Sequence, residues 1–165
     1  MNPTTEAYIG KNSSVTMETV QIKGVDSTYR DSHVVLEDGA SIIISEKVMT
    51  HGVQEAKSNF VVDMNGEDCK ANIVSRSIAR DNSKQSFVSK INGNNRCTGH
   101  TECDAIIMDN ATVTATPEVS ANHVDASLIH EAAIGKIAGE QLIKLMTLGL
   151  TEREAEEEII NGFLK

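Results

Sequence analysis

The pattern of hydrophobic and polar positions changes once along the chain, close to residue 137. Between Val15 and Lys136, short segments rich in β-forming residues are separated by turn formers, and hardly any stretch sustains a helical period. The predicted strands are Glu18–Ile22, His33–Leu36, Ser41–Ser45, Asn59–Asp63, Ala71–Ala79, Ser86–Ile91, Asp104–Met108, Ala111–Thr116 and Ala126–His130. The predicted turns include Glu37-Asp38-Gly39, Met64-Asn65-Gly66, Asn92-Gly93-Asn94-Asn95 and Asp109-Asn110. This part of the chain is therefore expected to be almost entirely β.

Two architectures explain many short strands at this spacing. Hairpins would build a β-sandwich, which is the commoner fold for such a pattern. A parallel β-helix also accounts for it, because the hydrophobic runs around Val35, Val61 and Val88 recur at about 26 residues, a plausible length for one solenoid coil. The residue pattern alone leaves both architectures open.

A helical pattern follows the β region. Between Gly139 and Leu148, apolar residues recur at helical spacing, and Gly149 can adopt the left-handed conformation that ends a helix. Thr151 and Glu154 then form a Ser/Thr-x-x-Glu capping box. It precedes an apolar stripe made of Ala155, Ile159 and Phe163, with a row of glutamates on the opposite side of the helix. We expect a β core over residues 1–137, with an irregular N-terminus, and a C-terminal helical hairpin over residues 138–165.

Composition narrows the possible partners. Aromatic residues make up 3% of the chain, so the core must be built from aliphatic side chains and methionine. The formal net charge of −9 and the lack of a Lys/Arg cluster argue against nucleic-acid binding. The sequence has no secretory signal pattern and no apolar run long enough to span a membrane, which predicts a cytoplasmic protein without membrane contact.

Three cysteines carry most of the candidate chemistry: Cys69, Cys97 and Cys103. An odd number without a secretion signal favours free thiols or metal chemistry over disulfides. The run from Asn94 to Asp104 is the densest constellation, with two thiols, one imidazole and two carboxylates. Its Cys-x-x-His-x-x-Cys spacing does not match known zinc sites, so a self-contained zinc site is improbable.

The predicted faces of the strands leave two interpretations of the candidate ligands. Cys103 begins a strand-like run in which Cys103, Ala105 and Ile107 share one face, so it can equally be a small buried hydrophobic residue. His130 and Glu131 end another strand and are expected on opposite faces of it. A buried Glu131 would need a charged partner or a metal ion.

The C-terminal part of the sequence resembles a known family. The stretches Cys103-Asp104-Ala105-Ile106-Ile107-Met108 and Leu128-Ile129-His130-Glu131-Ala132-Ala133-Ile134-Gly135-Lys136-Ile137 look like the end of the core of SufB and SufD proteins. The motifs Glu140-Gln141-Leu142, Leu148-Gly149-Leu150-Thr151 and Ile159-Ile160-Asn161-Gly162-Phe163 look like the helical region of the same family. Together these motifs cover roughly the last 65 residues.

This resemblance implies a right-handed parallel β-helix followed by helices, and a scaffold protein for iron–sulfur cluster assembly rather than an enzyme. It implies that Cys103, His130 and Glu131 hold a transient iron–sulfur cluster at the interface of a homodimer or a SufB/SufD-type heterodimer. It also implies that the C-terminal helices bind a SufC-like ABC-type ATPase, since the sequence has no nucleotide-binding loop of its own. The presence of both Cys103 and Glu131 makes the chain more SufB-like than SufD-like.

Two other functions compete with this expectation. A truncated paralogue that binds no metal would keep the fold and the helices as an interaction or regulatory subunit of the same complex. A β-helical enzyme acting on carbohydrate is disfavoured, because aromatic platforms and paired carboxylates are scarce.

Overall fold

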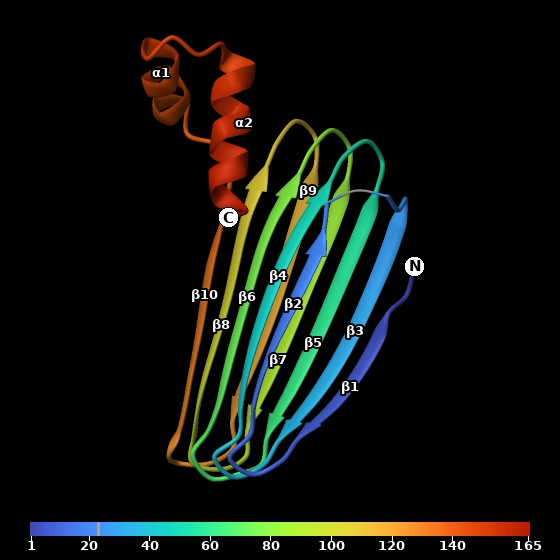
Figure 1. Cartoon of the computed structure of the whole chain (residues 1–165), viewed down its shortest axis with the longest axis vertical. Coiled ribbons are helices and arrows are strands. Elements are labelled where there is room, and N and C mark those ends of the chain that lie inside the picture. Colours follow the sequence, from blue (N-terminus) through green and yellow to red (C-terminus); the bar gives the residue numbers. More distant parts are fainter. Residues whose placement is uncertain (23) are drawn as a thin grey trace.

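The chain folds into a two-sheet parallel β-helix with two helices at one end (Figure 1). This computed structural model describes residues 1–22 and 24–165. Sheet A contains β1 (Thr4–Ile9), β3 (Ser27–Leu36), β5 (Glu55–Met64), β7 (Lys84–Gly93) and β9 (Thr112–Ala121) in that order. Sheet B contains β10 (Ala126–Gly135), β8 (Cys97–Ile107), β6 (Cys69–Ala79), β4 (Ser41–Thr50) and β2 (Ser14–Gln21). Successive strands alternate between the sheets, so five coils stack on one another and the β-sandwich alternative is excluded.

Each coil is slightly longer than the hydrophobic runs suggested. Ser27 pairs with Glu55, Glu55 with Lys84, and Lys84 with Thr112, which gives steps of 28, 29 and 28 residues. Val35, Val61 and Val88, the basis of the expected 26-residue repeat, do not stack, and all three lie on the outer face. The inner repeat is carried by positions such as Val34, Val62 and Ile91, which are paired in register and buried.

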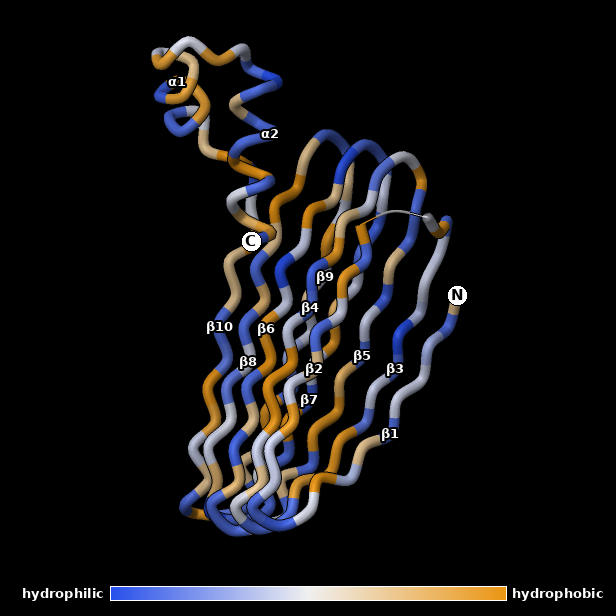
Figure 2. The backbone as a smooth tube through the Cα atoms, in the orientation of Figure 1, coloured by the Kyte–Doolittle hydropathy of each residue, from blue (hydrophilic) through white to orange (hydrophobic). Residues whose placement is uncertain are grey.

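Residues along most strands are alternately buried and more exposed, so successive side chains face inward and outward. Figure 2 shows the hydropathy changing along the same strands. Inner positions fill a core of aliphatic side chains around the only described aromatic pair, Phe60 and Phe87, whose ring centroids lie 6.0 Å apart. Each of the nine predicted strands overlaps one of β2 to β10, and three of them extend one residue beyond the observed strand. The N-terminal segment was expected to be irregular, but it forms β1, because its backbone pairs in register with β3.

The corners between strands repeat with the coils. Gly52, Asp81 and Asp109 occupy one corner with φ of 60°, 58° and 55°. The amide of Gly52 donates a hydrogen bond to the Asp81 carboxylate at 2.7 Å, and the amide of Asp81 donates to the Asp109 carboxylate at 3.0 Å. Asp tolerates the left-handed conformation, and its carboxylate accepts a hydrogen bond from the corner amide of the preceding coil. This explains why Asp can replace glycine here.

The two helices lie beyond the carboxyl ends of the sheet B strands (Figure 1). They are α1 (Gly139–Thr147) and α2 (Glu152–Phe163). The predicted left-handed stop at Gly149 has φ of 99°, and the predicted capping box of Thr151 and Glu154 is present. Ile160 of α2 packs with Ile78 and Ile106, so α2 covers the rim of sheet B at the ends of β6 and β8. Within residues 1–22 and 24–165, none of the helices has the length and apolar character needed to cross a membrane.

Candidate functional site

Cys103 points into the β-helix from β8. Its neighbours in register are Ser75 on β6 and Ala132 on β10, and its side chain is 1% exposed. Burial raises the pKa of the Cys103 thiol to about 11, and the negative charges of Asp104 and Glu46 add to this effect. The thiol is therefore held in its protonated form at neutral pH, whereas a metal ligand must be a thiolate.

The predicted alternation around Cys103 is confirmed for two of its three members. Cys103 and Ala105 are both buried on the inner face. Ile107 is only partly buried, whereas Ile106 packs against α2. The alternation breaks there because β8 ends under the helix, which buries a residue that would otherwise face outward.

His130 and Glu131 lie on opposite faces of β10. His130 faces inward opposite Thr101, and its Nδ1 atom is buried without a hydrogen-bond partner. Burial, together with the charge of His100, lowers the pKa of the His130 imidazole and favours its neutral form. The Glu131 side chain is 65% exposed on the outer face. One chain thus brings Cys103 and His130 to the same face, but not Glu131.

The other two cysteines form a separate pair. Cys69 and Cys97 are direct neighbours in register and both are buried. Burial and the neighbouring Cys97 raise the pKa of Cys69 to about 11. Cys97 and Cys103 are six residues apart on one strand, which corresponds to about 20 Å. The three thiols therefore do not converge on one point within the chain.

A second group of ligand atoms lies on the outer face of sheet B. The outer-face cluster consists of His100, Glu102 and Glu131, whose nearest ligand atoms all lie within 4.8 Å of one another. Glu102 and Glu131 are opposite each other in register, and His100 Nε2 lies 3.6 Å from a Glu131 carboxylate oxygen. The carboxyl of Asp104 hydrogen-bonds to Glu102 and, with burial, raises the pKa of Glu102.

The sequence alone does not predict that His100, Glu102 and Glu131 lie together. His100 and Glu102 belong to the run of candidate ligands around the cysteines, but the sequence alone does not predict them as a site. Strand alternation places them on the face opposite Cys103, and only the register of β8 with β10 brings Glu131 beside them. The missed signal was the two-residue spacing of His100, Glu102 and Asp104 along a single strand.

A buried carboxylate, that of Glu46, also faces the interior of the β-helix. Glu46 accepts hydrogen bonds from Ser58 at 2.5 Å and from Ser75 at 3.0 Å. Arg30 approaches one of its oxygens at 3.6 Å. Burial nevertheless raises the pKa of Glu46, because the loss of hydration disfavours its charged form. Glu46 therefore forms a polar centre in the interior two coils away from Cys103, with Ser75 between them in register.

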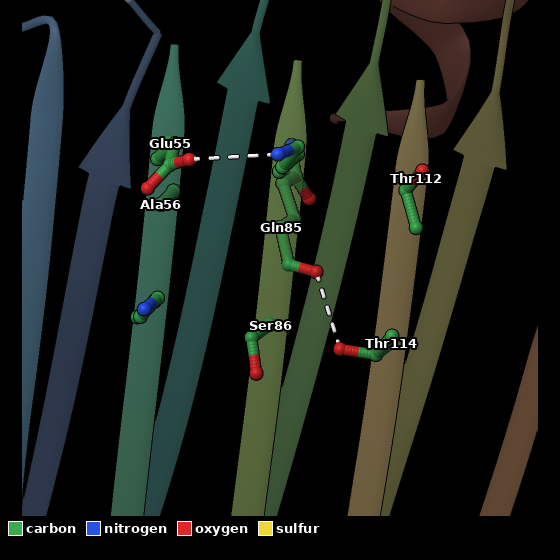
Figure 3. A pocket seen from close by; sticks show the side chains of 8 residues that line it. Glu55, Ala56, Gln85, Ser86, Thr112 and Thr114 are labelled. Atoms are coloured by element: carbon green, nitrogen blue, oxygen red, sulfur yellow. Dashed lines mark hydrogen bonds and ion pairs between the residues drawn. The ribbon is translucent and has the colours of Figure 1, made fainter. Parts of the chain in front are cut away.

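A shallow pocket on sheet A contains none of these residues (Figure 3). It lies at the start of β5, β7 and β9, where Lys84 and Glu55 form an ion pair at 3.9 Å. Thr114 donates a hydrogen bond to the Gln85 carbonyl at 3.4 Å. The lining brings together no group of ligands or nucleophiles, so it is not the candidate site.

Comparisons with known proteins identify relatives of the whole chain. The family model described as "SUF system FeS cluster assembly, SufBD core domain" matches residues 2–163. An iron–sulfur cluster assembly SufBD family protein of Methanocaldococcus jannaschii is 42% identical over 125 residues, which cover 74% of this chain and 40% of the relative. The iron–sulfur cluster assembly protein SufB of Bacillus subtilis is 36% identical over 97 residues, which cover 56% and 21%. The matches span less than half the length of either relative.

Proposed function

The chain belongs to the SufB/SufD core-domain family of iron–sulfur cluster assembly, and from this membership we propose that it is a scaffold on which a cluster is transiently held. The single observation that carries the proposal is the position of Cys103 and His130. They project from adjacent strands onto the same inner face in the last two coils of the β-helix. A thiolate with a nitrogen ligand suits a labile cluster, because it holds iron less tightly than four thiolates would.

The proposed site is completed by a second subunit. A cluster needs more donors than Cys103 and His130, and the cysteines at positions 69 and 97 are too distant to supply them. In the described residues, β9 and β10 pair with another strand on one side only, so their other edges offer backbone groups for pairing. We propose that a second copy, or a SufD-like partner, docks along this edge.

Glu131 has a conditional place in this site. Its carboxylate lies on the outer face of the edge strand, away from Cys103. Glu131 can bind the iron of a shared cluster only if the partner subunit places its own ligands against the outer face of β10. His130 is therefore the first candidate to share iron with Cys103, and Glu131 the second.

Anaerobic reconstitution with ferrous iron and sulfide tests the cluster assignment. The wild-type protein is expected to gain visible charge-transfer absorption, and Cys103→Ala is expected to lose it. Cys97→Ala is the matched control, because it removes a buried thiol from the same strand and should keep the absorption. An unchanged spectrum in Cys103→Ala would refute the role of this cysteine.

We also propose that the helices bind a SufC-like ATPase. Helix α1 has no buried residue, and Ile143, Met146 and Leu148 leave apolar surface exposed. Co-purification with such an ATPase should be lost on Ile143→Asp. Val53→Asp is the control, since Val53 is 82% exposed in the corner between β4 and β5, outside the helices, and should retain the partner. Retention by both variants would exclude this face of α1.

One observation favours a second candidate function. The Cys103 thiol is buried and its raised pKa disfavours the thiolate that iron requires. A subunit that binds the ATPase and the partner without holding metal would need no thiolate. A complex with the ATPase that contains no iron or sulfide after anaerobic reconstitution would support this alternative over the scaffold.

A further inference from the structure

We propose that the outer-face cluster of His100, Glu102 and Glu131 binds a divalent transition-metal ion, at a site separate from Cys103. Each residue offers one ligand atom, and the three atoms lie within 4.8 Å of one another. Two adjacent strands position them, because Glu102 of β8 and Glu131 of β10 are direct neighbours in register. The site therefore rests on sheet backbone rather than on a loop.

The histidine is oriented for metal binding by a residue outside the cluster. Nδ1 of His100 lies 2.9 Å from the side-chain oxygen of Asn72 on β6. Because that oxygen only accepts hydrogen bonds, Nδ1 carries a proton, and in the neutral form of the ring Nε2 presents a lone pair. Nε2 faces the Glu131 carboxylate at 3.6 Å. A histidine held at one nitrogen by a polar partner while the other faces carboxylates is the arrangement found at protein metal sites.

The local charge favours a cation. Glu102 and Glu131 are like charges in directly opposite positions, which is unfavourable on a sheet. Asp104 adds a third carboxylate on the same face, two residues along β8. Arg76 of β6 is opposite Asp104 in register and its charge also reaches Glu102, so a single arginine faces three carboxylates on this side of the sheet. A bound dication offsets their repulsion and satisfies the Nε2 lone pair.

The donor set defines the class of metal. One imidazole and two carboxylates suit Mn²⁺, Fe²⁺, Co²⁺ or Zn²⁺, whereas the absence of a thiolate among these three residues disfavours Cu⁺. Three protein ligands leave further coordination positions for water. Cys103 follows Glu102 directly and projects to the other face, so its thiol is not available to this ion.

Cobalt binding to the tag-free protein tests the proposal without iron or sulfide. We expect one Co²⁺ per chain with weak d–d absorption typical of nitrogen and oxygen ligands, and no thiolate charge-transfer band. Glu102→Gln and His100→Ala should each weaken binding at least about ten-fold, and Asn72→Ala about ten- to hundred-fold through misorientation of the ring. The ion should raise the unfolding midpoint of the wild type but not of these variants.

Two controls separate this site from the cluster proposal. Cys103→Ala should bind Co²⁺ normally, even if it loses the iron–sulfur absorption. His33→Ala should also bind normally, since His33 pairs with Asp63 at 2.7 Å on sheet A. The proposal is overturned if the wild type binds no Co²⁺, if Glu102→Gln and His100→Ala bind as the wild type does, or if Cys103→Ala abolishes binding.

Discussion

The Cys103 thiol of the folded protein should be alkylated far more slowly than the same thiol in the unfolded chain. Its pKa rises from the ordinary 9.0 to about 11 in the fold. At pH 8, about one ordinary thiol in ten is ionised, whereas only about one in a thousand is ionised at a pKa of about 11. Because the thiolate is the nucleophile, alkylation should slow about 100-fold from this effect alone, and a side chain only 1% exposed slows it further.

Iodoacetamide labelling followed by peptide mass spectrometry measures this rate. The protein is labelled in native buffer and in concentrated urea, and each cysteine peptide is quantified separately. Cys69 is an internal comparison, because its pKa is also raised to about 11 and its side chain is buried. Labelling of native Cys103 at the rate seen in urea would refute both its burial and its raised pKa.

Slow labelling would also constrain the proposed function. A metal that binds Cys103 must displace its proton, so loading of the site is expected to release protons and to proceed better at higher pH. Partner docking along β10 would change the surroundings of the thiol at the same time. Labelling repeated on the assembled complex would show whether the second subunit shields Cys103 or activates it.

Three stability predictions test the packing of the coils. Gly66→Ala should lower the free energy of unfolding by about 1–3 kcal/mol, because its Cβ would lie 2.0 Å from the Glu37 backbone. Gly162→Ala in α2 meets no neighbour and should raise the free energy of unfolding by up to about 1 kcal/mol. Urea denaturation compares the two variants, and equal effects would contradict the packing at Gly66. The raised pKa of Glu46 means that the folded state retains its proton above the unfolded value of 4.5, so stability should fall as pH rises from 4.5 through the folded pKa. Glu46→Gln should reduce that slope in urea midpoints measured across this pH range, and an unchanged slope would assign it to other groups. Thr151→Ala should cost about 1 kcal/mol through loss of the capping box, seen as faster amide exchange in α2 but not in β6.

The fold could be predicted in its elements more readily than in its repeat. Alternation and turn residues located nine strands, and the capping box located α2, because these signals depend on neighbouring residues. The coil length could not be read from Val35, Val61 and Val88, since these residues are not in register with one another on successive coils. The repeated left-handed corners at Gly52, Asp81 and Asp109 carry the true period, but Gly and Asp share no hydrophobic signature.

The candidate site was harder to predict for a physical reason. Strand alternation correctly separated His130 from Glu131, because it depends only on the order of residues in β10. The cluster of His100 and Glu102 with Glu131 depends on the register of strands about 29 residues apart. Register follows from the lengths of the corners, which the hydrophobic pattern does not specify.

Mössbauer spectroscopy of the protein reconstituted anaerobically with ⁵⁷Fe and sulfide would show whether Cys103 binds the iron of a cluster. We expect a doublet from sulfur-bound iron that disappears in Cys103→Ala, together with a high-spin ferrous doublet that disappears in Glu102→Gln. The proposed cluster scaffold would be contradicted if the wild type showed only iron bound by nitrogen and oxygen, or if Cys103→Ala kept the sulfur-bound signal.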